Sequence, residues 1–211
     1  MCVMEARRRG RRRIERWIAD VRLAQPAQRL AFEEYVQAVE EATARVERLT
    51  GYLTQEVAQW RWVSVVNALQ ACRGIQLLHA MRIVAELGDL SRFGHPRQLM
   101  SYLGLIPGED SSGERRRQGS ITKAGNGSAR RALVEAAWAY QYMAKVSGLI
   151  ARRQAKAPKA ALDIAWKAQV RLCARFRRLA ARGVSRNKIV VAIARELAGF
   201  VWAIAQKVKP V

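Results

Sequence analysis

The spacing of apolar residues predicts a helical protein. Through residues 27–60 the apolar positions alternate between spacings of three and four, with Glu and Arg beside them, which is the heptad pattern of a coiled coil. The seam consists of Phe32, Tyr35, Val39, Ala42, Val46, Leu49 and Leu53. One long helix is therefore expected. Its seam either pairs with another chain or folds back on its own domain, and we favour pairing between chains.

Shorter helical patterns fill the rest of the chain. Residues 61–90 predict two helices around a turn at Arg73 and Gly74. Further helices are expected in 97–104, 128–147, 158–181 and 186–208, with Gly183 as a helix stop and Ser185 as an N-cap. No convincing strand pattern is present, although residues 119–123 resemble a short extended piece. The predicted fold class is all-α, with a long coiled-coil helix followed by a helical domain.

A Gly-, Ser- and Arg-rich segment, residues 104–127, separates two of these helical patterns. Loops of about two dozen residues are uncommon in compact domains unless they are functional or disordered. The predicted organisation is thus a basic N-terminal segment (1–26), a coiled-coil helix (27–60) and a helical domain that carries this loop (61–211).

Charge points to a polyanionic partner. The chain has 38 Lys and Arg against 17 Asp and Glu, a net charge of +21. Residues 28–60 carry three basic and six acidic side chains, whereas residues 136–211 carry sixteen basic and two acidic ones. Such a basic region is typical of nucleic-acid binding. An anionic membrane surface is the rival partner, but no uncharged apolar run is long enough to span a membrane.

The other compositional signals are mainly exclusions. The three cysteines are far apart and form no CxxC motif, which argues against a disulfide framework or a zinc ribbon. His79 and His95 lack acidic or Cys companions at ligand spacing, so no metal site is predicted. The N-terminus lacks the apolar stretch of a signal peptide, so a reducing cytoplasm is the expected location.

The loop contains the parts of a serine nucleophile site. Attack on a phosphodiester needs an exposed hydroxyl and positive charge on the non-bridging oxygens. Ser111 and Ser112 supply hydroxyls, and no general base is obvious. The candidate cations are Arg115, Arg116, Arg117, Lys123, Arg130 and Arg131. A plain phosphate-binding loop is the alternative interpretation.

The turn at Arg73 and Gly74 has two interpretations as well. The sequence of residues 69–88 resembles helix-hairpin-helix modules, which bind nucleic-acid backbones. Glycine in such a turn also has a purely steric explanation, in which case the two helices form a structural hairpin.

Several segments together resemble one family. They are Gly74-Ile75, residues 85–93, Pro96-Arg-Gln-Leu-Met-Ser-Tyr-Leu-Gly-Leu-Ile-Pro107, Ser111-Ser-Gly113, Arg117-Gln-Gly-Ser-Ile-Thr-Lys-Ala-Gly-Asn126 and Arg130-Arg-Ala-Leu-Val-Glu-Ala-Ala-Trp138. They are similar to transposases of bacterial insertion sequences that join an N-terminal RuvC-like domain to a C-terminal serine-bearing domain, the bridge-RNA-guided recombinases.

This resemblance implies roles for the predicted parts. The heptad helix, residues 28–58, is expected to assemble a homo-oligomer. Ser112 is expected to be the nucleophile that becomes joined to DNA, with Ser111 as the nearest alternative. The residues expected to contact DNA or guide RNA are Arg73, Gly74, Arg115, Arg116, Arg117, Lys123, Asn126, Arg130 and Arg131.

The chain also departs from the family pattern. The family's RuvC-like domain supplies four acidic residues that bind Mg²⁺, and this chain begins about where that domain ends, with no comparable acidic cluster. The resemblance therefore implies a C-terminal transposase portion in a bacterial cytoplasm, whose Mg²⁺ comes from another polypeptide. The alternatives are an inert nucleic-acid-binding remnant and a generic basic RNA-binding protein.

Overall fold

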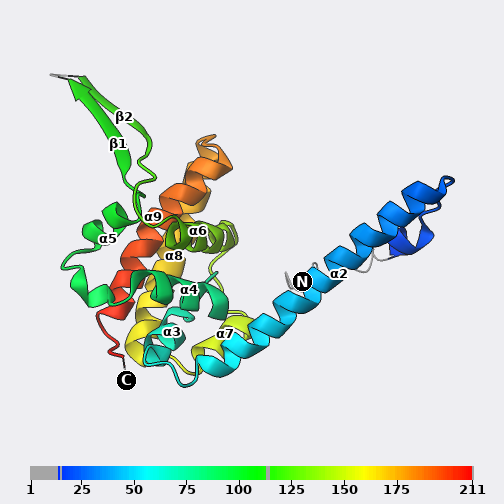
Figure 1. Ribbon diagram of the computed structural model, residues 1–211. Helices are drawn as coiled ribbons and strands as arrows, with labels where there is room; N and C mark the ends of the chain where they lie inside the picture. The colour runs from blue at the N-terminus through cyan, green and yellow to red at the C-terminus, as the bar shows by residue number, and fades with distance from the viewer. Residues whose placement is uncertain (1–13, 15, 113–114, 211) are drawn as a thin grey trace. The chain divides into compact units, whose positions relative to one another are not determined.

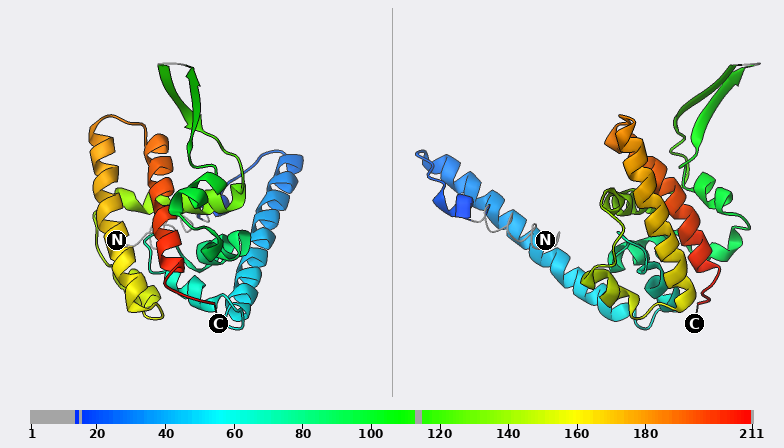
Figure 2. Two further views of the ribbon diagram at one scale, coloured as in Figure 1. Left: turned by 90° about the vertical axis from the view of Figure 1, so that its left-hand side faces the viewer. Right: turned by 180° about the vertical axis from the view of Figure 1, so that it is seen from behind.

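The computed structural model describes residues 14, 16–112 and 115–210. The chain divides into two compact units, Met1–Tyr52 and Leu53–Val211. Each unit is described by itself, and Figures 1 and 2 show their elements from three sides.

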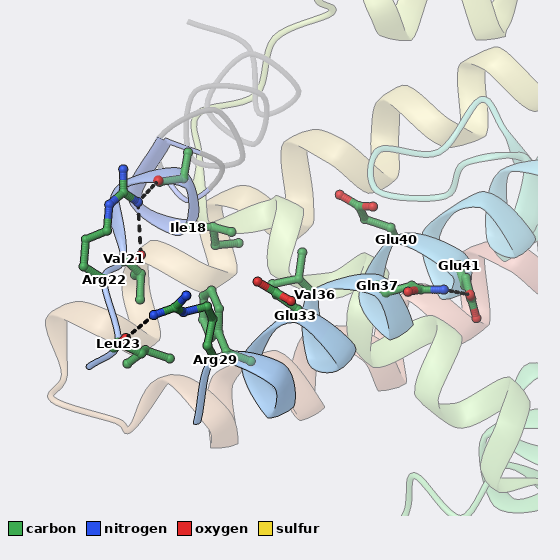
Figure 3. A pocket seen from close by; sticks show the side chains of 12 residues that line it. Ile18, Val21, Arg22, Leu23, Arg29, Glu33, Val36, Gln37, Glu40 and Glu41 are labelled. Carbon is green, nitrogen blue, oxygen red and sulfur yellow. Dashed lines mark hydrogen bonds between the residues drawn. The ribbon is translucent and has the colours of Figure 1, made fainter. Parts of the chain in front are cut away.

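The first unit is dominated by helix α2 (Pro26–Glu56), which confirms the long helix expected at 27–60 and ends four residues earlier. A helical segment through residues 16–20 precedes it. Residues 18–23 and the first turns of α2 line a hollow, where Arg22 donates a 2.8 Å hydrogen bond to the carbonyl of Ala19 (Figure 3). The Arg29 guanidinium donates to the carbonyl of Leu23 at 3.4 Å.

Helix α2 has no buried residue. The exposed fraction is 75% for Tyr35, 66% for Val39 and 62% for Val46. The heptad seam is thus open to solvent, and pairing of this seam stays a prediction.

The second unit is a helical domain, which confirms the all-α class. Its helices are α3 (Val63–Leu69), α4 (Leu77–Leu87), α5 (Pro96–Tyr102), α6 (Gly127–Ala137), α7 (Gly148–Gln154), α8 (Lys159–Ala181) and α9 (Arg186–Ala205), with short 3-10 turns η1 (Leu90–Arg92) and η2 (Trp138–Gln141). The helix expected over 128–147 ends at Ala137. The N-cap of α7 is Ser147, whose hydroxyl accepts from the amide of Ile150. Helix α7 was not expected.

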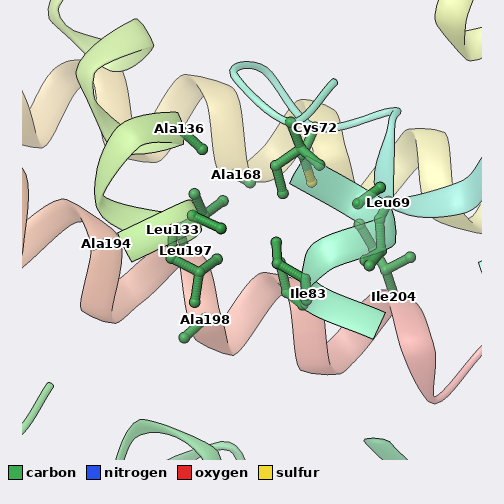
Figure 4. Close-up of a cluster of buried hydrophobic side chains, with 14 of the residues drawn as sticks. Leu69, Cys72, Ile83, Leu133, Ala136, Ala168, Ala194, Leu197, Ala198 and Ile204 are labelled. Atoms are coloured by element: carbon green, nitrogen blue, oxygen red, sulfur yellow. The ribbon is translucent and has the colours of Figure 1, made fainter. Parts of the chain in front are cut away.

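The core of this unit is organised around α9, which packs against α8, α6, α5 and α3. Leu197 and Ile204 on α9 are fully buried, as are Leu133 on α6 and Leu69 on α3 (Figure 4). Small side chains let the helix backbones approach closely, and these include Ala136, Ala168, Ala194 and Ala198. The apolar face predicted for residues 186–208 is therefore core.

The expected loop differs from the structure. Residues in the middle of this segment form a two-stranded antiparallel ribbon, β1 (Pro107–Ser112) and β2 (Arg115–Ile121). The strand sequences, PGEDSS and RRRQGSI, are almost entirely polar, so the alternation of apolar and polar residues that signals most strands is missing.

Two local predictions concern the helix ends. Gly183 follows α8 with φ +73°, and the amide of Val184 donates back to the carbonyl of Leu179 at 3.2 Å, as in a Schellman stop. Ser185 is the N-cap residue of α9, but its side chain makes no capping hydrogen bond. Within the described part of the chain, every helix is too short or too polar to cross a bilayer.

Candidate nucleic-acid interface

The β-hairpin places both candidate serines directly across from arginines. The Cα partners are Ser112 with Arg115, Ser111 with Arg116, and Asp110 with Arg117. Ser112 and Arg115 are the last paired positions before the tip. Consecutive strand positions belong to opposite faces of a ribbon, so Ser111 and Ser112 are not interchangeable positions.

The base of the hairpin is fixed to the helical domain by main-chain bonds. The amide of Thr122 donates to the carbonyl of Ile106 at 2.9 Å, and the amide of Lys123 donates to that of Gly104 at 3.1 Å. Lys123 has φ +55°, a backbone angle that residues other than glycine rarely adopt. These bonds extend the pairing of the strands down to the end of α5.

Two glycines make this close approach possible. Gly104 and Gly125 have φ +62° and +76°. A Cβ atom on Gly104 would collide with the carbonyl oxygen of Ala124, and one on Gly125 would collide with that of Tyr102. No larger residue fits either position without moving the backbone of the base.

Arg130 closes the base from the side of α6. Its guanidinium donates to the carbonyl of Leu103 at 2.8 Å and to that of Ala124 at 3.2 Å. The sequence predicts that this arginine contacts nucleic acid, and its place near a helix N-terminus, where a cation opposes the helix dipole, is in keeping with a role other than helix stability. The structure adds an architectural role, since the charge is directed to carbonyl oxygens that flank the hairpin. Arg131, by contrast, is exposed.

Asn126 links the hairpin base to α4. As the N-cap of α6 it accepts from the amide of Ala129 at 2.8 Å, and it donates to a carboxylate oxygen of Glu86 at 2.7 Å. Hydrogen bonds to the side chains of Ser128 and Asn126, with the larger effect from Ser128, hold the pKa of Glu86 below its usual value. Arg82 donates to the hydroxyl of Ser128 at 2.8 Å.

Sequence reasoning missed Arg82, Glu86 and Ser128. An Asn placed at the start of a helical pattern is a cap signal, but no sequence signal pairs it with a carboxylate forty residues earlier in the chain. Together these residues form a polar brace, defined as Arg82, Glu86, Asn126 and Ser128, between α4 and the start of α6.

Arg73 and Gly74 lie elsewhere. Gly74 has φ +84°, and a Cβ atom there would collide with the carbonyl oxygen of Ala136 at the far end of α6. Arg73 donates to the carbonyl of Met143 at 2.6 Å, and its guanidinium lies 5.9 Å from the ring centre of Tyr142. Since α6 has 11 residues, about 16 Å separates its two ends. The structure therefore does not bring this turn to the hairpin.

Neither histidine lies among metal ligands. The Nδ1 of His95 accepts from the amide of Arg97 at 3.1 Å and caps α5, while the Nε2 of His79 lies 3.4 Å from a carboxylate oxygen of Glu135. Over the described residues, no group of three or more His, Cys, Asp or Glu side chains is placed to hold a metal ion.

The region just described is similar to a known protein family. Residues 66–152, which run from α3 to α7 and include the hairpin, match the Transposase IS116/IS110/IS902 family. This region contains the polar brace and both candidate serines.

Named relatives extend the similarity. A protein of Sinorhizobium fredii named as transposase y4qE is 42% identical over 194 residues, which is 92% of this chain and 46% of that protein. A family 20 transposase of Pseudomonas aeruginosa is 32% identical over 105 residues, which is 50% of this chain and 29% of that protein. The transposase for insertion sequence element IS1111A of Coxiella burnetii is 35% identical over 69 residues, 33% of this chain and 19% of that protein.

The chain spans less than half the length of these relatives. The matched domain nevertheless coincides with the hairpin and its supports. The family match and the named relatives together show that the chain is similar to insertion-sequence transposases.

Proposed function

We propose that this chain is the serine-bearing part of an insertion-sequence transposase and that Ser112 cleaves and exchanges DNA strands. The observation that carries the proposal is the strand register, in which Ser112 pairs with Arg115 at the last position before the tip of an anchored hairpin. The backbone thus pairs a serine with an arginine near the end of a ribbon whose base is hydrogen-bonded to the residues that follow α5.

The proposed reaction is an in-line exchange at phosphorus. The Oγ of Ser112 attacks a DNA phosphodiester, a P–O bond to one nucleotide breaks, and the departing oxygen takes up a proton as a free hydroxyl. A phosphoserine ester remains, and attack by a hydroxyl of another strand reverses the step and frees Ser112. Arg115 and Arg117 belong to the same face of the ribbon as Ser112, whereas Arg116 belongs to the face of Ser111. We assign to Arg115 and Arg117 the stabilisation of charge on the non-bridging oxygens.

The described residues do not fit a Mg²⁺ site, because their carboxylates are not grouped. We therefore assign both the base that removes the serine proton and any Mg²⁺ requirement to an acidic domain separate from these 211 residues. No step above depends on a metal held by this chain.

We assign three kinds of partner to this chain: DNA, a guide RNA and further copies of the chain itself. DNA is the substrate, and a guide RNA is proposed as the second nucleic acid on the basis of the family resemblance. Self-association is assigned to residues 28–58, because the seam of α2 leaves its apolar side chains uncovered.

The test is a covalent adduct. The chain is mixed with the acidic domain of a related transposase and a DNA substrate whose cleaved strand diffuses away, and the product is examined by denaturing electrophoresis. We expect a protein–DNA adduct that Ser112→Ala abolishes and Ser111→Ala leaves in place.

The variants separate three outcomes. Loss of the adduct with Ser111→Ala alone would move the nucleophile by one position and keep the mechanism. An adduct that survives in the double variant would exclude both serines. If no adduct forms while salt-sensitive DNA binding remains, the chain is a nucleic-acid-binding remnant, an alternative that the lack of grouped carboxylates among the described residues favours.

A further inference from the structure

Helix α8 carries a line of cations along one side. The α8 ridge, as we name it, follows spacings of four, four, three and four residues, which keep its members on one stripe of a helix. Its members are Lys167, Arg171, Arg175, Arg178 and Arg182. All are exposed except Arg175, which is half-buried. The buried side of α8, which includes Leu172 and Phe176, packs into the core instead.

The centre of the ridge is concave. A hollow of about 330 Å³ is lined by Arg171, Ala174, Arg175 and Arg178. The methyl side chain of Ala174 leaves room between the longer side chains. A hollow walled by guanidinium groups is large enough for a phosphate and has the opposite charge, and arginine binds phosphate through paired hydrogen bonds.

One carboxylate holds two of these cations in place. Glu196 on α9 lies 2.9 Å from the Nε of Arg171 and forms a second ion pair with Arg175. The exposed fraction is 18% for the Glu196 side chain and 64% for that of Arg171. The Nε of Arg175 is buried and makes no hydrogen bond. Among the described residues, Glu196 is the one carboxylate that pairs with ridge members, so the ridge carries an excess of positive charge that a polyanion would neutralise.

The ridge leads toward the hairpin. Its last members lie beside the turn between α8 and α9, and this turn and the β1–β2 hairpin project from the same end of the unit in every view (Figures 1 and 2). Helix α5, from which the hairpin base continues, packs on α9, the helix that follows this turn.

We propose that the α8 ridge binds the backbone of double-stranded DNA that flanks the strand served by the hairpin. This inference rests on the proposed function for the identity of the nucleic acid. Fifteen residue steps along α8 span about 22 Å, which corresponds to about six base pairs of duplex. No ridge member is aromatic, and Trp166 lies on another stripe of α8, whereas single strands are bound through stacking platforms.

The experiment measures the binding of the full chain to a 30-base-pair DNA duplex of arbitrary sequence between 0.1 and 1 M salt, without cleavage. The test variant is Lys167→Gln/Arg171→Gln/Arg178→Gln. Each phosphate contact contributes about 0.9 to the slope of log affinity against log salt, or about eightfold in affinity over this range. We expect the slope to fall by about 2.7 and the affinity at 0.1 M salt to fall by a few hundredfold.

The matched control is Lys145→Gln/Lys156→Gln/Lys159→Gln, which removes the same charge from exposed positions off the ridge. We expect it to change the slope by less than about one. Circular dichroism and thermal melting check that both variants are folded.

Three results would overturn the inference: equal losses in the two triple variants, an unchanged slope in the ridge variant, or a ridge effect seen only with an RNA duplex. The proposed function has a separate readout. Ser112→Ala is expected to remove the adduct and to leave duplex binding and its salt slope intact, so failure of one proposal can be told from failure of the other.

Discussion

Helices α2 and α8, with 31 and 23 residues the two longest helices of the described residues, differ in which side chains they bury and which they expose. Helix α2 buries none of its residues, exposes a continuous apolar seam and belongs to a segment with a net charge of −3. Helix α8 buries its apolar stripe, including Ala168 and Leu172, and turns cations to solvent. Apolar surface without cover is suited to another protein surface, whereas an excess of cations over carboxylates is suited to a polyanion. The two roles that we propose, assembly and nucleic-acid binding, therefore fall on different helices.

The largest expected effect is on the free energy of unfolding. It compares a substitution in the buried core of the second unit with one in the exposed seam of α2. Leu197→Ala should lower the free energy of unfolding of the second unit by about 2–5 kcal/mol, because Leu197 is fully buried. Val46→Glu should leave that quantity within about 0.5 kcal/mol, because Val46 is 62% exposed, and should instead dissociate oligomers. Denaturant titration and analytical ultracentrifugation measure the two quantities.

A matched seam control sharpens this result. Ala44→Glu adds the same charge at an exposed position of α2 outside the seam and should keep the oligomer. If Ala44→Glu and Val46→Glu dissociate the protein equally, charge rather than the seam explains the effect. If neither does, the seam has no part in assembly.

A smaller effect is expected at the hairpin base. Gly104→Ala should cost about 3 kcal/mol, since it combines a positive φ with a collision at the Ala124 carbonyl. Gly183→Ala shares the positive φ but meets no atom within 4 Å, so it should cost about 1 kcal/mol. Thermal unfolding of both variants compares strain with and without the collision, and equal costs would mean that the base can shift to make room.

The smallest effect concerns acid sensitivity of the polar brace. The pKa of Glu86 is lower in the folded chain than in the unfolded one. Its contribution to stability is therefore complete above the unfolded pKa, near 4.3, and is lost as pH falls through the folded value. Glu86→Gln should flatten the fall in melting temperature below about pH 4.5, whereas removal of the exposed carboxylate in Asp163→Asn should not. Parallel acid profiles for the two variants would contradict a pKa shift at Glu86.

Periodicity recovered most of the fold because helices with one buried face display that face in sequence. The apolar positions of α9, such as Val190 and Leu197, were predicted and are core. The hairpin was missed because its stability depends on main-chain pairing and on two left-handed glycines at its base rather than on an apolar face. The break after Ala137 was missed because the pattern of small and aromatic residues continues through it.

The candidate site divides in the same way. Ser111, Ser112 and the arginines that follow them were visible because they are neighbours in sequence. The pairing of Asn126 with Glu86, and the bonds from Arg130 to two carbonyls, join segments that are 40 and up to 27 residues apart. Such contacts depend on how α4, α5 and α6 pack, which no local pattern encodes.

The anchored root of the ribbon has a consequence for how its length can vary among related chains. A change of two residues in each strand would move the tip by about 7 Å and keep the same hydroxyl on the same face. A change of one would present the opposite face to the substrate. The distance between the tip and the base can therefore change only in steps of two residues per strand if the same face is to be kept. The junction of the base with α5 and α6 does not change.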